Sequence, residues 1–78
     1  MNYNNAFALV KIELSEATSK FGKFASQHEG IAVIREEYLE LEKEVFKKQS
    51  EYDHNQLKKE ATQLAAMAIR FLIDCEEE

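Results

Sequence analysis

The sequence predicts an all-α fold built from three helices, on three observations. The chain of 78 residues has no proline and only two glycines, so it lacks the residues that mark the turns of β-rich folds. Glu, Lys, Ala and Leu are abundant, and all four favour helix. Apolar residues recur at intervals of three and four along three segments. We therefore expect a single all-α domain over residues 1–78, with helices at residues 5–21, 27–48 and 54–75.

The first expected helix carries one apolar stripe and should end at a glycine. The stripe consists of Tyr3, Phe7, Val10, Leu14, Ala17 and Phe21. Gly22 follows it, and glycine commonly ends helices because it accepts a positive φ. In the short link after Gly22, the aromatic ring of Phe24 is expected to anchor the chain in the core.

The second and third expected helices both start at capping patterns. Ser26 with Glu29 fits a capping box, and Asp53 with Gln56 resembles one. The second helix has an apolar stripe formed by Ile31, Ile34, Tyr38, Leu41 and Val45.

The third helix is apolar over well over half of its circumference, at Leu57, Ala61, Leu64, Ala65, Met67, Ala68, Ile69, Phe71, Leu72 and Ile73. Such a helix is surrounded by other elements, and two further helices from so short a chain can hardly surround it. We therefore expect the three-helix chain to assemble into a helical bundle through homo-oligomerisation. Cys75, the single cysteine, has no partner for an intrachain disulfide and is expected to be a buried thiol.

Charge and composition narrow the class of protein further. With 10 basic and 15 acidic residues the net charge is −5, which argues against nucleic acid as a partner because phosphate binding depends on Lys and Arg. No apolar run reaches the roughly 18–20 residues needed to cross a membrane. The first five residues lack the basic region of a secretion signal. We expect a cytoplasmic protein.

The chemistry that the sequence suggests lies in its carboxylates. Four acids of the second helix fall within an arc of about 100°: Glu36, Glu37, Glu40 and Glu44. The ordinary interpretation of such a pattern is an acidic face exposed to solvent. Glu60, by contrast, lies in the middle of an apolar stripe on the third helix.

A lone buried carboxylate is costly and is normally paired, protonated or bound to a metal. Two interpretations of Glu60 therefore stay open. It either pairs with a Lys or Arg of another helix, or it holds a divalent cation together with Glu37 and Glu40. Oxygen ligands of this kind suit Mg²⁺ or Mn²⁺.

These residues also form a familiar order of motifs. Residues 36–40 read EExxE, and residues 60–63, Glu-Ala-Thr-Gln, follow in a helix that becomes rich in alanine. Together with the stretches at 20–30 and 63–71, this order resembles the MazG-like nucleotide pyrophosphohydrolases of the all-α NTP pyrophosphatase superfamily, in their small phage and bacterial forms. The resemblance covers roughly residues 7–75.

The resemblance implies an Mg²⁺-dependent hydrolase that releases pyrophosphate and a nucleoside monophosphate from a nucleoside triphosphate. Glu37, Glu40 and Glu60 match the metal ligands of the family. Glu36 matches the leading glutamate of EExxE and is expected to act as an outer-shell or a water-orienting group. Gln63 stands where the family usually has Asp, which removes one negative charge from the metal site. A glutamine oxygen can still reach a cation or a bound water, so Gln63 is expected as the fourth metal ligand. The family forms homodimers, or tetramers built from dimers.

Three residues are candidates for binding the substrate: Arg70, Lys59 and His28. Arg70 could instead pair with Asp74 four residues on, and His28 could be an ordinary surface residue in the first turn of its helix. The alternative function is a non-catalytic helical dimer of the same fold that acts as an interaction or nucleotide-sensing module. The change at Gln63 favours this alternative, and the retained glutamates favour the enzyme.

Overall fold

The computed structural model, described here for residues 1–76, confirms a chain of three α-helices and contains no strand in that range. Helix α1 spans Tyr3–Lys20, α2 spans Gln27–Val45 and α3 spans His54–Cys75. A short 3-10 turn at Gln49–Glu51 lies between α2 and α3. None of the helices in the described range is long and apolar enough to cross a membrane.

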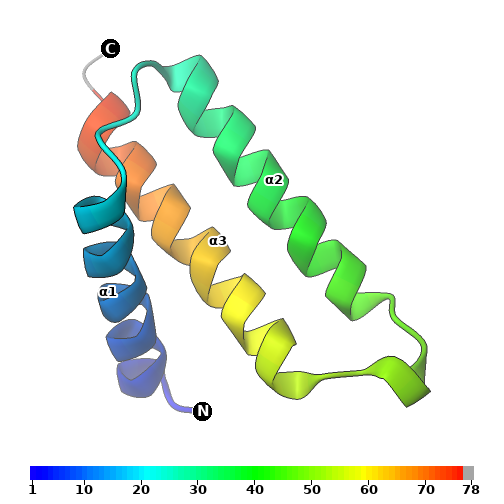
Figure 1. Ribbon diagram of the computed structural model, residues 1–78. Coiled ribbons are helices and arrows are strands. Elements are labelled where there is room, and N and C mark those ends of the chain that lie inside the picture. The colour runs from blue at the N-terminus through cyan, green and yellow to red at the C-terminus, as the bar shows by residue number, and fades with distance from the viewer. Residues whose placement is uncertain (77–78) are drawn as a thin grey trace.

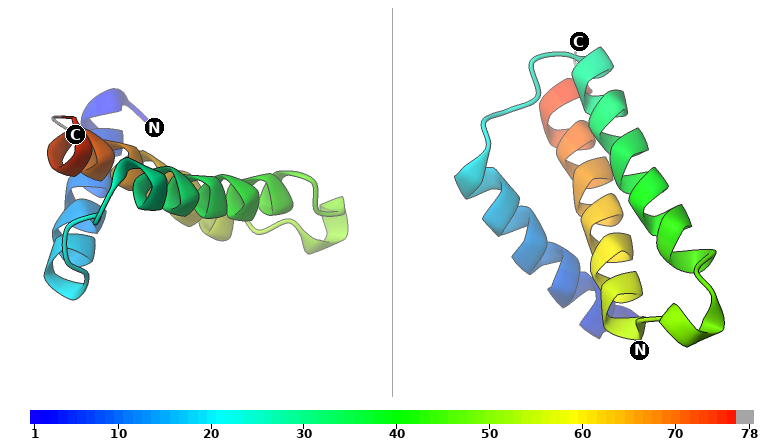
Figure 2. Two further views of the ribbon diagram at one scale, coloured as in Figure 1. Left: turned by 90° about the horizontal axis from the view of Figure 1, so that it is seen from above. Right: turned by 45° about the vertical axis from the view of Figure 1, so that its right-hand side comes forward.

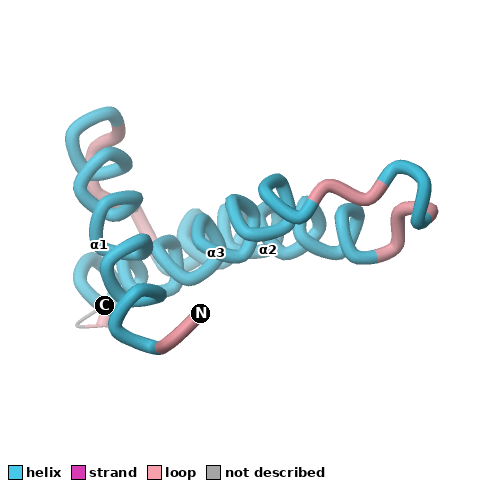
Figure 3. The backbone as a smooth tube through the Cα atoms, turned by 90° about the horizontal axis from the view of Figure 1, so that it is seen from below, coloured by secondary structure: helices cyan, strands magenta, loops and turns pink. Residues whose placement is uncertain are grey.

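Helix α3 lies in the middle of the fold and contacts both of its neighbours (Figure 1). Helices α2 and α3 run side by side in opposite directions, whereas α1 crosses them steeply and projects out of their plane (Figures 2 and 3). Within the described residues, α1 and α2 make no close backbone contact with each other. The space between α1 and α2 is therefore closed only by side chains, the link between the two helices and the face of α3.

The start of each helix is fixed by a short polar side chain. The Asn2 side chain accepts a hydrogen bond from the Asn5 N–H, which lets α1 begin two residues before its expected start at residue 5. Ser26 Oγ accepts from the Glu29 N–H at 3.1 Å, as the capping pattern predicts, and Glu29 Oε1 accepts from the N–H of Ala25. Thus Glu29 closes the cap one residue earlier than in a standard capping box.

The cap of α3 differs from the expected pair. Asp53 Oδ1 accepts hydrogen bonds from the N–H groups of Asn55 and Gln56, so the Asp53 cap is confirmed. The Gln56 side chain does not reach back to the cap, because its Nε2 donates to Glu60 Oε1 at 2.7 Å. Helix α2 also ends at Val45 rather than at residue 48, since the backbone leaves helical geometry at Phe46.

Helix α1 ends close to Gly22, as the sequence predicts, but Gly22 does not take the left-handed conformation that commonly ends helices. The helix ends at Lys20, Phe21 takes an extended conformation with φ −125°, and neither glycine has a positive φ. The carbonyl of Gly22 instead accepts a hydrogen bond from Arg70 Nη2 on α3 at 2.6 Å. This bond fixes the link between α1 and α2 to the last turns of α3.

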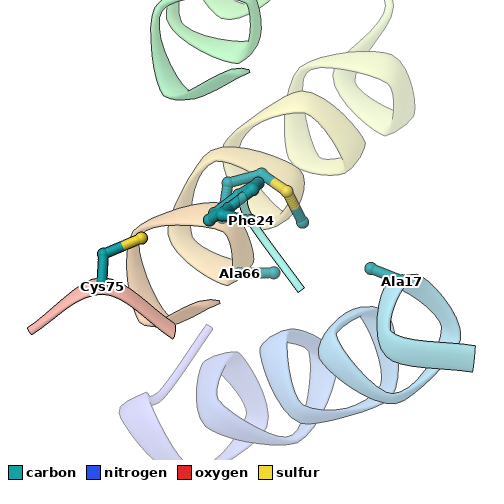
Figure 4. Close-up of a cluster of buried hydrophobic side chains, with 5 residues drawn as sticks. Ala17, Phe24, Ala66 and Cys75 are labelled. Atoms are coloured by element: carbon teal, nitrogen blue, oxygen red, sulfur yellow. The ribbon is translucent and has the colours of Figure 1, made fainter. Parts of the chain in front are cut away.

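The core is small and centres on α3. Its buried apolar side chains come from α1, from the link that follows it and from α3 (Figure 4): Ala17, Phe24, Ala66, Met67 and Cys75. The expectations that Phe24 anchors the link in the core and that Cys75 is a buried thiol are thereby confirmed. Phe24 is held there by its backbone N–H, which donates to Asp74 Oδ2 at 3.0 Å, and by the Arg70 guanidinium, which lies 4.4 Å from the centre of its ring.

Much of the predicted apolar surface remains exposed in the single chain. The exposed members of the expected stripes are Tyr3, Phe7, Phe21, Ile31, Tyr38, Val45, Leu72 and Ile73. Helix α3 has apolar residues on most of its sides, and α1 and α2 of the same chain cover only part of that apolar surface.

Candidate functional site

The carboxylate of Glu37 is the least satisfied acidic group in the interior. Its side chain is half-buried on α2, and Oε2 has lost contact with water without gaining a hydrogen-bond partner within the described structure. Burial raises the pKa of Glu37, and the neighbouring charges of Glu60, Glu40, Glu13 and Glu36 raise the pKa further. Carboxylates from all three helices thus raise the pKa of one half-buried carboxylate.

Glu60 is buried on α3, as its place among apolar residues predicts. Only 6% of it is exposed, and its Oε1 accepts the hydrogen bond from Gln56. No Lys or Arg nitrogen between residues 1 and 76 lies within 4.0 Å of it, so the interpretation of Glu60 as half of an ion pair is wrong. The negative charge of Glu60 therefore faces Glu37 with no cation beside it in the described chain.

The acidic stripe of α2 is only partly a solvated face. Glu36 and Glu40 are exposed, but Glu37 is half-buried and Glu44 is buried. The Lys47 ammonium pairs with Glu44 at 2.8 Å and balances its charge. Glu37 therefore differs from Glu44 in having no such cation.

The expected metal ligands are close together but not assembled. Glu37 is within electrostatic reach of Glu40 and Glu60. Even so, no three His, Cys, Asp or Glu side chains in residues 1–76 are positioned to hold one ion. The donor set of hard oxygens fits Mg²⁺ or Mn²⁺ in its chemistry. Gln63, the fourth expected ligand, is half-buried and lines the groove next to Glu37.

A groove of about 760 Å³ lies between α1, α2 and the face of α3. Its acidic wall combines Glu36 and Glu37 of α2 with Glu13 and Glu16 of α1. Its floor is Gln63, Met67 and Arg70 of α3. The end of α1 adds Lys20, and the link between α1 and α2 adds Gly22, Lys23 and Phe24. Glu36, Glu37 and Gln63 thus share the groove, whereas Glu40 and Glu60 do not line it.

Of the three expected substrate-binding residues, the structure brings only Arg70 to the groove. Arg70 is buried and donates to the Gly22 carbonyl and to Met67 Sδ. Its expected alternative, a pair with Asp74, is wrong, because the Asp74 carboxylate accepts from the Phe24 backbone. Lys59 is exposed beside a separate hollow between α1 and α3, and His28 is exposed in the first turn of α2.

Sequence reasoning missed four charged residues of this groove. Glu13, Glu16 and Lys20 follow one another at intervals of three and four on α1, a helical spacing that is visible in the sequence. That spacing predicts that the three residues share one face of α1. It does not predict which helix this face packs against, because that depends on the steep crossing of α1. Lys23 gave no signal, since its place depends on the path of the link.

Comparison with protein-family models, curated proteins and solved structures found no match to this chain. The fold and the site therefore define a small all-α protein with a charged groove, and its function has to be inferred from the groove itself.

Proposed function

We propose that this chain is an Mg²⁺-dependent nucleoside triphosphate pyrophosphohydrolase that acts on free nucleotides in the cytoplasm. The single observation that carries the proposal is the buried, unpartnered Oε2 of Glu37, which lies in the field of Glu60, Glu40 and Glu13. Buried carboxylates without a cation are costly, and a divalent cation removes that cost. The resemblance of residues 36–40 and 60–63 to the MazG-like motifs supports the same proposal.

Under this proposal Glu37, Glu40 and Glu60 hold the cation, and Gln63 contributes a neutral oxygen where the resemblance expects Asp. When bound, the cation polarises a phosphoryl oxygen and lowers the pKa of the attacking water. Glu36 is exposed in the groove beside Glu37, so its carboxylate is free to orient that water and accept its proton. The groove volume of about 760 Å³ lies within the range of small-molecule sites.

The proposal includes a homodimer, or a tetramer built from dimers. Large apolar side chains remain exposed on every helix of the single chain, for example Phe7, Ile31 and Leu72. Chains of this length bury only about 60% of their unfolded surface, so a second copy would supply a large share of the stability. Sedimentation equilibrium of the whole chain measures this state directly.

Pyrophosphate release from a panel of NTPs and dNTPs, with Mg²⁺ or Mn²⁺, tests the activity. Glu60→Gln should abolish release while leaving the helix content and the oligomer intact, because a glutamine oxygen can still accept the Gln56 hydrogen bond. Glu42→Gln is the matched control, since Glu42 is exposed on α2 and does not line the groove. Release by Glu60→Gln at the wild-type rate would show that the assigned ligand is wrong.

A second function is a non-catalytic helical dimer that senses nucleotides or binds a partner. Two observations favour it: the carboxylates are not preassembled as a ligand set in residues 1–76, and Gln63 removes one charge from them. Nucleotide binding without pyrophosphate release by the wild type and by Gln63→Asp would support this function over the enzyme.

A further inference from the structure

Three cationic side chains gather at the end of the groove away from Glu37. Lys20 is the last residue of α1, Lys23 lies in the following link, and Arg70 reaches them from α3. All three line the groove, and Lys23 and Arg70 also line the adjoining hollow on the other side of the link. The Arg70–Gly22 hydrogen bond and the Phe24–Asp74 hydrogen bond hold the link against α3 at this end.

None of these cations has an acidic partner in the part of the chain that the structure describes. No carboxylate of residues 1–76 lies within 4.0 Å of Lys20, Lys23 or Arg70. Arg70 is the strongest case, because only 6% of it is exposed and its neighbours are a carbonyl, a thioether and the ring of Phe24, all neutral. A buried guanidinium without a counter-anion is costly, and it has five N–H donors of which the described contacts use only some.

We propose that this end of the groove, formed by Lys20, Lys23 and Arg70, binds the terminal phosphates of a polyphosphate chain. This inference rests on the proposed function for the source of the polyphosphate, a nucleoside triphosphate. The planar fork of Arg70 suits two phosphate oxygens at once, and the two lysines add mobile point charges. A single carboxylate ligand would leave two of the three cations unmatched, which favours a ligand with several charges.

The order of the residues along the groove agrees with this arrangement of a polyphosphate chain. Gln63 and Arg70 are seven residues apart on α3, which is about 10 Å of helix axis, with Glu37 beside the first and the lysines beside the second. The α-phosphate would lie near Glu36 and Glu37, and the leaving pyrophosphate would lie at the cationic end. The cations then stabilise negative charge on the leaving group.

Three acids near the cationic end bear on the strength of binding. Asp74 lines the adjoining hollow with Lys23 and Arg70, and its Oδ2 accepts the Phe24 N–H, so its charge also opposes an anion there. Glu29 is engaged at the start of α2, where its Oε1 accepts the Ala25 N–H. Glu16 lies one turn before Lys20 on α1 and opposes an anion there. Binding of polyphosphate should therefore be weak without a divalent cation and stronger with one, but it should depend on the lysines in both conditions.

Calorimetric titration with inorganic tripolyphosphate, once in EDTA and once in Mg²⁺, tests the inference. Lys20→Gln and Lys23→Gln should each weaken binding about fivefold, the range for one partly exposed charge pair, and the double variant more than tenfold. Both lysines are exposed, so folding should be unaffected. Lys11→Gln and Lys43→Gln, which are exposed and do not line the groove, are matched charge controls and should bind within twofold of wild type.

The outcomes separate this inference from the proposed function. Equal losses in the groove and control variants would overturn the inference, because they would reflect net charge alone. Unchanged binding in the double variant would also overturn it, even if Mg²⁺-dependent pyrophosphate release occurred. Binding that depends on Lys20 and Lys23 in a protein that releases no pyrophosphate would support the inference and overturn the enzyme.

Discussion

Gly30 of α2 packs directly against the rings of Phe71 and Phe24, and replacing it by alanine tests the packing of α2 on α3. A Cβ at this position would lie 2.7 Å from Phe71 Cδ2, 3.1 Å from Phe71 Cε2 and 3.2 Å from Phe24 Cδ2. Favourable carbon–carbon contacts lie at about 3.5–4.0 Å, so the rings must move. Both rings belong to the core around α3, so they have little free space in which to move.

Two effects of Gly30→Ala oppose each other. Overpacking of this kind costs about 1–3 kcal/mol, whereas alanine gains about 0.5–1 kcal/mol over glycine within a helix. The net loss in the free energy of unfolding should be about 1 kcal/mol, which lowers Tm by roughly 4–8 °C in a domain of this size. Gly22→Ala is the matched control, because a Cβ there meets nothing within 4 Å and its φ is not positive.

Thermal and urea unfolding followed by circular dichroism measure both variants. Gly22→Ala should be neutral or stabilising by up to about 1 kcal/mol. Adding Phe71→Leu to Gly30→Ala should recover part of the loss, since the clashing ring atoms are removed. The packing of α2 on α3 described above would be refuted if Gly30→Ala were at least as stable as Gly22→Ala.

Three further predictions concern the groove and its supports. In EDTA, the free energy of unfolding of the wild type should rise as the pH falls from neutral towards 4.5, because the raised pKa of Glu37 lets the folded state take up a proton before the unfolded chain does. In thermal melts, Glu37→Gln should show no such rise and should be more stable than the wild type at neutral pH. Asp74→Ala should lower stability by about 1.5 kcal/mol in urea unfolding, because the N–H of Phe24 loses its charged acceptor, and Asp74→Asn should lose less. Gln63→Asp should lower the Mg²⁺ concentration that gives half-maximal pyrophosphate release; an unchanged value would show that residue 63 does not contact the cation.

The features of the fold that sequence predicts well are local. Ser26 and Asp53 cap their helices through hydrogen bonds to residues two or three positions away, and such spacing is visible in the sequence. The end of α1 near Gly22 was also predictable, but the hydrogen bond that its carbonyl accepts from Arg70, 48 residues along the chain, was not. Similarly, the acceptor for the Phe24 N–H is 50 residues away at Asp74, where the local spacing instead suggested a pair with Arg70.

The site divides in the same way. Glu60 among apolar residues predicted a buried carboxylate, and the α2 pattern placed Glu37 on a shared face with Glu40, so their proximity was foreseeable. The influence of Glu13 on Glu37 could not be foreseen, because it depends on the steep angle at which α1 packs on the rest of the fold (Figure 3). Helical periodicity gives the face of a residue, but the crossing angle of two helices depends on how their side chains pack together.

Binding of Mn²⁺, followed by electron paramagnetic resonance, tests the cation site between α2 and α3 most directly. We expect one Mn²⁺ per chain, displaced by Mg²⁺ and bound at least tenfold more weakly by Glu60→Gln than by Glu42→Gln. Mn²⁺ that stays free at millimolar concentration, or that binds Glu60→Gln as tightly as wild type, would contradict a cation held by Glu37, Glu40 and Glu60.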